Sequence, residues 1–205
     1  MMEKKPPAGN LAPLVVKLGG SLIAHVPDLV PVFFKSPRPL VIVPGGSVFA
    51  DAVRKTRTDD LAAHWMAIAA MDQYGWYIVS KGMSPTHRLE IPKETVVFLP
   101  YCTLRGCDPL PHSWAVTSDS IAAWVADKLG LGLLVLKSVD GIMKNDLLLE
   151  VVDSPLETQT VDPFFLPFVL ENKVRTHVIN GTNRDRVEKF LTGEKVPGTG
   201  ICTTF

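Results

Sequence analysis

Cysteine is scarce in this chain of 205 residues. The three cysteines, Cys102, Cys107 and Cys202, form an odd set without a CxxC pair. This usage argues against a disulfide framework and against a zinc site. Free thiols are typical of a reducing compartment, so we expect the protein in the cytoplasm. No residue is assigned as a metal ligand from the sequence.

An excess of charge of either sign is also lacking. The 21 Lys and Arg residues balance the 21 Asp and Glu residues, which gives a formal net charge of zero. A neutral chain has no global field that draws it to nucleic acid or to an anionic membrane. We therefore expect neither among its partners, and any anion site has to be local.

Long hydrophobic runs are missing as well. The most apolar helical stretch, 61–71, contains His64 and is too short to cross a bilayer. The first ten residues hold two lysines and two adjacent prolines and no apolar core of signal-peptide length. We expect a flexible tail over residues 1–10 and a single domain over residues 11–205.

What the chain does contain is a series of short apolar runs rich in Val, Ile and Leu. Continuous hydrophobicity is what strands need when helices cover both faces of a parallel sheet. The runs are Leu14–Val16, Leu40–Val43, Val96–Leu99, Leu133–Leu136 and Val178–Ile179. With 46% hydrophobic and 20% charged residues, they predict an α/β protein, a three-layer α/β/α sandwich with a mainly parallel central sheet.

Helical patterns fall between these strands. They cover Val48–Thr56, Leu61–Tyr74, Ser118–Leu129 and Arg184–Leu191. The third is the clearest, because Thr117 or Ser118 can cap its start, Asp119 falls in its first turn and Gly130 follows its end. Glycine and proline predict surface loops over 80–95 and 101–111.

Two predicted strands run into glycine pairs. The first leads into Lys17-Leu18-Gly19-Gly20 and the second into Pro44-Gly45-Gly46-Ser47. A strand, a glycine pair and a helix start together offer backbone N–H groups and a positive helix end to an anion, so two such turns can hold two phosphates. Ordinary βα turns remain the alternative from these residues alone, because neither GxGxxG nor GxxxxGK[ST] is present.

Further segments appear in a fixed order along the chain. They are Thr117-Ser118-Asp119-Ser120, Lys137-Ser138-Val139-Asp140-Gly141-Ile142 and Gly198-Thr199-Gly200-Ile201. Together with the two glycine turns, they make the chain resemble the amino acid kinase family, which includes acetylglutamate kinase, bacterial UMP kinase and isopentenyl phosphate kinase. The resemblance covers nearly the whole chain and implies an ATP-dependent phosphotransferase.

Three further stretches sharpen the resemblance toward one branch of that family. They are His64-Trp65-Met66-Ala67-Ile68 with Met71-Asp72, His112-Ser113-Trp114-Ala115, and Val178-Ile179-Asn180-Gly181. The branch phosphorylates [5-(aminomethyl)furan-3-yl]methyl phosphate in methanofuran biosynthesis. The resemblance therefore implies ATP with Mg²⁺ bridging its phosphates, a small phosphate ester as acceptor, and at least a homodimer.

The resemblance also implies roles for residues on the donor side. Lys17 matches the lysine that stabilises the moving phosphoryl group, and Asp119 matches the acid that orients this lysine. Gly19 and Gly20 match the turn that touches the terminal phosphates of the nucleotide. Lys137, Asp140 and Gly141 match nucleotide-side positions, although a plain turn remains the alternative for the last two.

Other residues are implied on the acceptor side. Gly45, Gly46 and Ser47 match the turn that faces the acceptor phosphate, with Ser118 expected nearby. His64 stands in a branch-like motif and is expected at the acceptor, with a packed structural histidine as the alternative. Asp72 is expected to face an amine, with a solvated carboxylate as the alternative.

One departure from the family pattern concerns a second catalytic lysine. Many members carry it in a GGMxxK-like segment, where this chain reads Val161-Asp162-Pro163-Phe164-Phe165-Leu166-Pro167. We expect another cation, Lys137 or the metal, to supply the missing charge; a weak or inactive kinase is the alternative. A different acceptor within the family (UMP, isopentenyl phosphate or an amino acid) and a non-catalytic nucleotide or oxyanion binder remain the alternative functions.

Overall fold

The computed structural model describes residues 11–145 and 147–202; the tail expected over residues 1–10 lies outside them. Its main sheet has eight strands in the order β3-β4-β2-β1-β5-β9-β10-β8. They span Leu14–Leu18 (β1), Leu40–Pro44 (β2), Ser84–Thr86 (β3), Val96–Phe98 (β4), Gly132–Lys137 (β5), Val151–Val152 (β8), Thr176–Asn180 (β9) and Thr199–Ile201 (β10). All neighbours are parallel except β9 and β10. A small antiparallel pair joins β6 (Met143–Lys144) to β7 (Leu147–Leu148).

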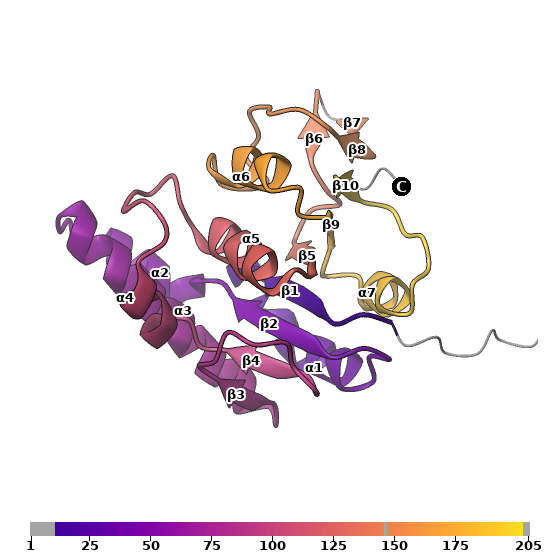
Figure 1. Ribbon diagram of the computed structural model, residues 1–205, viewed down its shortest axis with the longest axis horizontal. Coiled ribbons are helices and arrows are strands. Elements are labelled where there is room, and N and C mark those ends of the chain that lie inside the picture. The colour runs from indigo at the N-terminus through magenta and orange to yellow at the C-terminus, as the bar shows by residue number, and fades with distance from the viewer. Residues whose placement is uncertain (1–10, 146, 203–205) are drawn as a thin grey trace, which may run out of the picture.

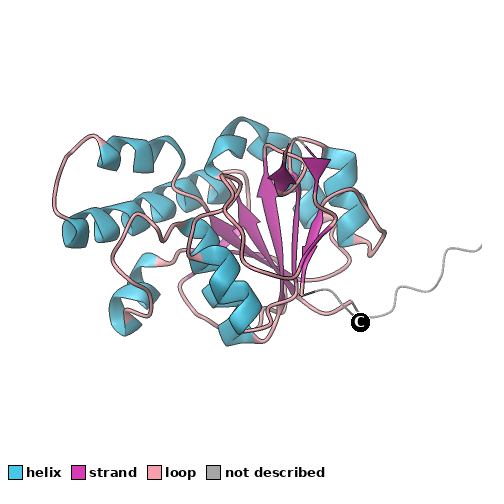
Figure 2. Ribbon diagram, turned by 90° about the horizontal axis from the view of Figure 1, so that it is seen from above, coloured by secondary structure: helices cyan, strands magenta, loops and turns pink. Residues whose placement is uncertain are grey.

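Helices lie on both sides of this sheet, as Figure 2 shows. They are the 3₁₀ helix η1 (Gly20–His25) and α1 (Val26–Phe34), α2 (Ser47–Arg54), α3 (Asp60–Val79), α4 (Tyr101–Cys107), α5 (Ser118–Leu129), α6 (Phe165–Glu171) and α7 (Arg184–Leu191). In Figure 1, α1 and α7 lie together on one side of the sheet. Helices α5 and α6 lie together on its other side. No helix in the described part is long and apolar enough to span a membrane.

The strands are apolar on both faces because each face has its own core. Val15 of β1 packs in a cluster with Ile121 and Val125 of α5. Val16, the next residue along β1, packs in a second cluster with α1 and α7. Successive side chains of a strand point to opposite faces, so both residue types have to be apolar. The predicted three-layer α/β/α fold is confirmed.

Several element boundaries differ from the predicted ones, each for a physical reason. Helix α3 continues through Gly75 to Val79, and since a Cβ at Gly75 would lie 2.4 Å from Leu99 Cδ2, the glycine serves the close packing of a core leucine and does not end the helix. A helix, α4, occupies most of the segment predicted as a loop over 101–111, and the prolines follow its end. Strand β3, within the predicted 80–95 loop, tolerates Pro85 because it is an edge strand.

The topology creates one opening at the carboxyl ends of the central strands. The chain starts in the middle of the sheet at β1, builds outward through β2 and β4, and then returns to the other side of β1 as β5. The chain leaves β1 toward β2 on one side of the sheet, and it leaves β5 toward β9 and β8 on the other side. The loops that follow β1 and β5 therefore separate. A ligand site is therefore expected beyond Leu18 and Lys137.

Candidate active site

A cavity of about 440 Å³ lies at this switch point of the sheet. Lys17 enters its wall from β1, Lys137 from the end of β5, and Asp119 from the first turn of α5. Gly20 and Gly46, one from each glycine turn, also line it. The cavity therefore brings together residues that lie up to about 120 positions apart in the chain, as a ligand site at the edge of a parallel sheet does.

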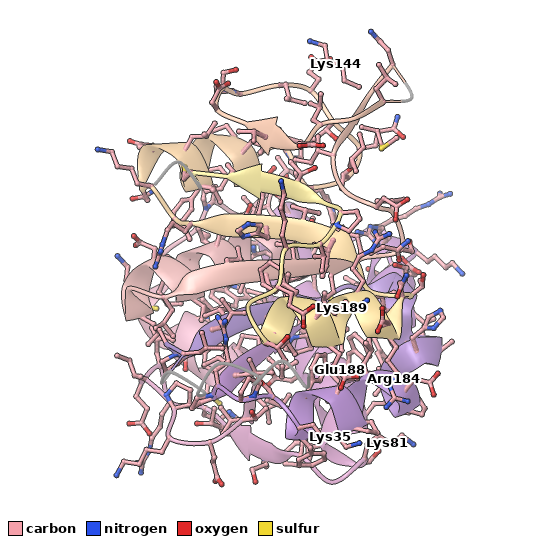
Figure 3. All side chains as sticks on the ribbon, turned by 90° about the vertical axis from the view of Figure 1, so that its right-hand side faces the viewer. Lys35, Lys81, Lys144, Arg184, Glu188 and Lys189 are labelled. Carbon is pink, nitrogen blue, oxygen red and sulfur yellow. The ribbon has the colours of Figure 1, made fainter. Side chains whose placement is uncertain are left out.

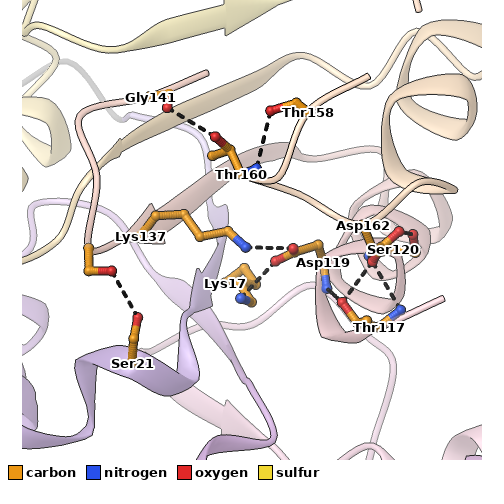
Figure 4. A network of polar contacts seen from close by, with 11 residues as sticks. Lys17, Ser21, Thr117, Asp119, Ser120, Lys137, Gly141, Thr158, Thr160 and Asp162 are labelled. Atoms are coloured by element: carbon orange, nitrogen blue, oxygen red, sulfur yellow. Dashed lines mark hydrogen bonds and ion pairs between the residues drawn. The ribbon is translucent and has the colours of Figure 1, made fainter. Parts of the chain in front are cut away.

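Lys17, Asp119 and Lys137 form an ionic triad at this wall (Figure 4). Lys17 Nζ lies 2.7 Å from Asp119 Oδ1, and Lys137 Nζ donates a 2.6 Å hydrogen bond to Asp119 Oδ2. The side chains of Lys17 and Asp119 are 4% and 5% exposed, and that of Lys137 is 17% exposed. The triad therefore carries two ammonium groups and one carboxylate at the cavity wall.

Burial and mutual charge shape the pKa values of the triad. Burial lowers the pKa of Lys137, and the neighbouring Lys17 lowers it further, to about 8. Burial would raise the pKa of Asp119, but the charges and hydrogen bonds of Lys17 and Lys137 hold it below its usual value. Near pH 7 the carboxylate is therefore ionised and Lys137 is mainly protonated.

The position of Asp119 depends on how helix α5 begins. Thr117 caps the helix, and its hydroxyl accepts a 3.4 Å hydrogen bond from the Asp119 N–H. The carboxylate of Asp162, from the segment before α6, accepts from the N–H and hydroxyl of Thr117 at 3.0 and 2.8 Å. It also accepts from the N–H of Ser120 at 3.1 Å and from the Ser120 hydroxyl. Asp162 thus fixes the turn that carries Asp119.

Sequence reasoning missed this role of Asp162. The residue stands in the segment where the second family lysine is absent, and it is 7% exposed. Burial raises its pKa, as does the nearby charge of Asp119, while the hydrogen bonds from Ser120 and Thr117 oppose that rise. The available signal was a lone acid beside Val161 in an otherwise apolar stretch, which is costly unless the acid is hydrogen-bonded.

The two glycine turns pack directly against each other. A Cβ on Gly20 would lie 2.6 Å from the Ser47 nitrogen, and one on Gly45 would lie 2.8 Å from the Gly20 nitrogen. The Ser47 hydroxyl donates a 3.0 Å hydrogen bond to the Gly20 carbonyl across this contact. The glycines are therefore needed for the close approach of the turns, whatever they bind.

Two of the predicted phosphate contacts do not agree with this packing. The Gly19 N–H donates to the Leu136 carbonyl at 3.1 Å, and the Gly45 N–H donates to the Leu18 carbonyl at 2.9 Å. The expectation that these two residues offer N–H groups to phosphates is therefore wrong for this conformation. Both are buried between strand ends, where a backbone N–H has to be hydrogen-bonded.

Gly20, Gly46 and Ser47 remain at the cavity wall. Ser47 begins α2, and N–H groups in the first turn of a helix have no intrahelical acceptor. Its backbone φ of 49° lies in the left-handed region, which is uncommon for a residue other than glycine. This turn therefore presents backbone donors and the positive end of α2 to the cavity.

The predicted acceptor-side residues separate into two groups. His64 and Ser118 line the cavity. Burial lowers the pKa of His64, and the neighbouring His112 lowers it further. Asp72 is absent from the cavity wall among the described residues and instead accepts a 3.2 Å hydrogen bond from the Tyr101 N–H. Burial raises its pKa, and its predicted place beside a substrate amine is wrong for this conformation.

Asp140 and Gly141, predicted on the nucleotide side, lie beyond the described wall of the cavity. Asp140 Oδ1 pairs with Arg186 Nη1 at 2.5 Å and accepts from Asn180 at 3.2 Å. The hydrogen bond from Arg186 lowers the pKa of this exposed carboxyl. Gly141 is buried, and a Cβ there would lie 2.6 Å from Thr199 Oγ1. Their contact with a nucleotide stays a prediction.

Helix α2 brings further polar groups to the cavity that sequence reasoning did not single out. Asp51 and Arg54 line it and pair with each other at 2.7 Å, and the Arg54 guanidinium lies 4.9 Å from the centre of the Trp114 ring. Trp114 is 40% exposed and lines the same cavity. The available signal was the polar face of the predicted 48–56 helix.

No protein-family model matches the chain. One similar protein, [5-(aminomethyl)furan-3-yl]methyl phosphate kinase of Methanocaldococcus jannaschii, is 29% identical in an alignment that covers 88% of this chain and 93% of that protein. The resemblance drawn from the motifs is confirmed by this match.

Solved structures give the same picture for the fold. Uridylate kinase from Archaeoglobus fulgidus aligns with a TM-score of 0.67 and 16% identity, over 93% of this chain and all of the other. UMP kinase from Bacillus anthracis gives 0.65 and 15% over 94% and 96% of the two chains. An isopentenyl phosphate kinase gives 0.62 and 15% over 92% and 100%. The chain therefore has the predicted amino acid kinase-like fold.

Proposed function

We propose that this chain, which resembles the amino acid kinase family in sequence and in fold, transfers the γ-phosphoryl group of ATP to a small phosphate monoester. The observation that carries the proposal is the placement of Lys17 and Lys137 on opposite oxygens of Asp119, at the wall of a cavity. The preferred acceptor is [5-(aminomethyl)furan-3-yl]methyl phosphate, the substrate in the name of the similar protein from Methanocaldococcus jannaschii. The product is the corresponding diphosphate, with ADP.

Electrostatics supply most of the catalysis in this proposal. During phosphoryl transfer, negative charge is spread over the oxygens of the moving group, and fixed cations in a dry site stabilise that charge. Lys17 and Lys137 are held in place by Asp119 before the substrates bind, so little reorganisation is needed. The first turn of α2 adds backbone N–H donors for the phosphate of the acceptor.

No side chain has to act as the nucleophile. An oxygen of the acceptor phosphate, already anionic at pH 7, forms the new bond to the γ-phosphorus of ATP. The bond from that phosphorus to the oxygen that bridges it to ADP breaks, and ADP leaves with the bonding electron pair. The protein therefore acts by positioning two anions in line and by neutralising their repulsion.

Lys137 is our candidate for the cation that replaces the second family lysine. It reaches Asp119 from β5, on the opposite oxygen from Lys17. Its pKa of about 8 leaves it mainly protonated near neutral pH. The segment 161–167, where the family lysine is missing, instead supplies Asp162 as the cap of α5.

The cavity offers little to hold a metal ion tightly by protein groups. Both oxygens of Asp119 are paired with lysines, and Asp51 is paired with Arg54, so Asp60 is the one lining acid without an ion pair among the described residues. Mg²⁺ prefers oxygen ligands and commonly binds through substrate phosphates and water. We therefore propose that Mg²⁺ enters with ATP, whose charge it partly neutralises, and that the residues described here bind the phosphates themselves.

An aminomethyl group on the acceptor is a cation at neutral pH, so an acid at the cavity wall would favour it. Asp60, in the first turn of α3, lines the cavity and makes no ion pair within the described residues. We propose Asp60, in place of Asp72, as the group that faces this amine. UMP and isopentenyl phosphate carry no such ammonium group.

The test is ADP formation with ATP and Mg²⁺ and a panel of acceptors: the aminomethylfuran phosphate, UMP and isopentenyl phosphate. We expect turnover with the furan phosphate, and mass spectrometry should detect its diphosphate. A clear preference for UMP or isopentenyl phosphate would overturn the acceptor but leave the kinase proposal in place. No ADP above background with any acceptor would overturn the kinase proposal.

Lys17→Ala separates a kinase from a non-catalytic nucleotide binder. A kinase loses turnover in this variant by about a hundredfold or more, the range seen when one group that stabilises the transition state is removed. A binder shows no turnover in either form and retains its affinity for ATP. Lys35→Ala is the matched control, because Lys35 is an exposed lysine beside α1 and outside the cavity wall (Figure 3).

Two coarser properties complete the proposal. We propose a homodimer or larger homo-oligomer, because Leu61, Met66 and Trp76 of α3 expose 56%, 40% and 52% of their surface. Light scattering after size exclusion should give at least twice the mass of 22.4 kDa. We also propose that the protein works in the cytoplasm, where ATP is present.

A further inference from the structure

A cluster of two histidines and one aspartate, side chains that commonly bind metal ions, lies beside the cavity. His64 comes from α3, while Asp108 and His112 come from the segment between α4 and α5. One ligand atom from each residue lies within 4.8 Å of the other two. His112 Nε2 lies 2.7 Å from Asp108 Oδ1, and the rings of His64 and His112 are stacked with their centres 4.2 Å apart.

The surrounding structure holds these three groups in place. Asp108 ends α4 with a left-handed backbone, φ 40°, and its N–H donates to the Leu104 carbonyl. Pro109 and Pro111 restrict the backbone between Asp108 and His112. The Trp65 ring meets the rings of both histidines edge to face, with centres 4.9 and 5.5 Å away. These contacts restrict the conformations of the cluster before a ligand binds.

Two imidazole nitrogens and one carboxylate oxygen form a ligand set for a borderline divalent metal ion. Zn²⁺ takes such ligands at about 2.0–2.2 Å, which in a tetrahedral site places neighbouring ligand atoms about 3.3 Å apart. The ligand atoms lie within 4.8 Å of one another, and because the lone pair of a ring nitrogen lies in the ring plane, one of the two stacked rings has to turn before both nitrogens point to one ion. Mg²⁺ prefers oxygen and octahedral geometry, so this site would not compete for the metal that accompanies ATP.

We propose that His64, Asp108 and His112 bind one divalent transition metal ion of the Zn²⁺ class, with one coordination position left toward the cavity. His64 lines the cavity itself, as do Ser113 and Trp114, which directly follow His112. The ion ties the segment that carries Ser113 and Trp114 to α3. It therefore fixes one wall of the cavity, and this inference stands independently of the kinase proposal.

The test is Zn²⁺ binding to the full chain after treatment with EDTA and desalting, measured by competition with a chromogenic chelator. Cys102 and Cys107 are exposed in α4 beside the cluster, so the experiment uses the Cys102→Ser, Cys107→Ser background to remove thiol ligands. We expect one equivalent of Zn²⁺. His64→Ala and His112→Ala should each weaken binding by at least about tenfold, and Asp108→Asn should weaken it in the same direction.

His177→Ala is the matched control, because His177 lies on β9 against Phe190 and outside the cluster. It should bind Zn²⁺ like the parent protein. Zn²⁺ should also raise the melting temperature of the parent and of His177→Ala, and raise that of His112→Ala less. Binding of less than one equivalent, or equal affinity in the parent and in the His64 and His112 variants, would overturn the inference.

Discussion

Lys137 Nζ lies 2.6 Å from Oδ2 of Asp119, on the opposite side of the carboxylate from the oxygen that Lys17 meets. The single carboxylate therefore holds two ammonium groups that would otherwise repel each other in a buried place. The triad itself carries two ammonium groups and one carboxylate, so it keeps one positive charge in excess within a protein whose formal net charge is zero. The two ammonium groups at the cavity wall are therefore a local attraction for anions, and burial of their side chains strengthens it.

The lowered pKa of Lys137 predicts a pH dependence of activity. Above about pH 8 the ammonium loses its proton, and with it the charge that we assign to phosphoryl transfer. The kcat/KM value reports ionisations of the free enzyme, so at pH 9 it should have fallen about tenfold from its plateau. In Lys137→Arg the guanidinium stays charged, and the fall should move above pH 9.

The measurement is a profile of kcat/KM from pH 6 to 10 for the parent, Lys137→Arg and Lys81→Arg. Lys81 is exposed and lies over the Tyr77 ring, so its replacement should leave the profile unchanged. Coinciding profiles for all three proteins would show that Lys137 is not the group that titrates.

Removal of the shared carboxylate should cost stability as well as activity. Asp119→Asn leaves Lys17 and Lys137 buried without a counter-charge, a change that typically costs about 3–5 kcal/mol. Urea denaturation measures this loss as a fall in the free energy of unfolding. Asp127→Asn, in the same helix, breaks only a pair with the largely exposed Lys128 and should cost less than about 1 kcal/mol. Equal losses in the two variants would contradict the structural role given to the triad.

Asp162 should matter through the helix that it caps. In Asp162→Asn an amide NH₂ replaces one acceptor oxygen and faces the donors of Thr117 and Ser120. Leaving such buried donors unpaired costs about 1–3 kcal/mol, and the displaced first turn should lower kcat by moving Asp119. The free energy of unfolding and kcat are compared with those of Asp153→Asn, an exposed acid with a single local hydrogen bond. An unchanged kcat in Asp162→Asn would show that Asp119 is positioned without this cap.

Local signals in the sequence predict much of this fold. Helices α5 and α7 span the predicted ranges because each has an N-cap side chain and a regular apolar spacing. The apolar runs predict strands β1, β2, β4, β5 and β9, since buried parallel strands are hydrophobic on both faces. Helix α4 was missed because Gly106 is typical of a loop. In the structure, Gly106 lies within the helix, and a Cβ there would meet no atom within 4 Å.

The site was predicted where a motif lies at a strand or helix end, and missed where contacts span the fold. Lys17 and Asp119 stand in such motifs, and they meet at 2.7 Å. Asp162 lies more than 40 residues from the turn that it caps, so no local sequence pattern predicts its hydrogen bonds to that turn. The hydrogen bonds of Gly19 and Gly45 to neighbouring strands depend on sheet order, which glycine spacing alone does not give.

The close contact between the turn at Gly20 and the turn at Ser47 predicts that a side chain at position 20 destabilises the protein through steric overlap. In Gly20→Ala the new Cβ would lie 2.6 Å from the nitrogen and 2.7 Å from the Cα of Ser47. These are backbone atoms, so the two turns have to separate, and overpacking of this kind costs about 1–3 kcal/mol. Because Ser47 and Gly20 both line the cavity, kcat/KM should fall as well.

Gly106→Ala is the control for Gly20→Ala, since a Cβ at Gly106 meets nothing within 4 Å. Alanine is the better helix former within α4, so this variant should be stabilised by about 0.4–1 kcal/mol with activity unchanged. Both free energies of unfolding come from urea denaturation, and kcat/KM comes from the ADP assay. If Gly20→Ala keeps parental stability and activity, the spacing of the two turns does not control the cavity.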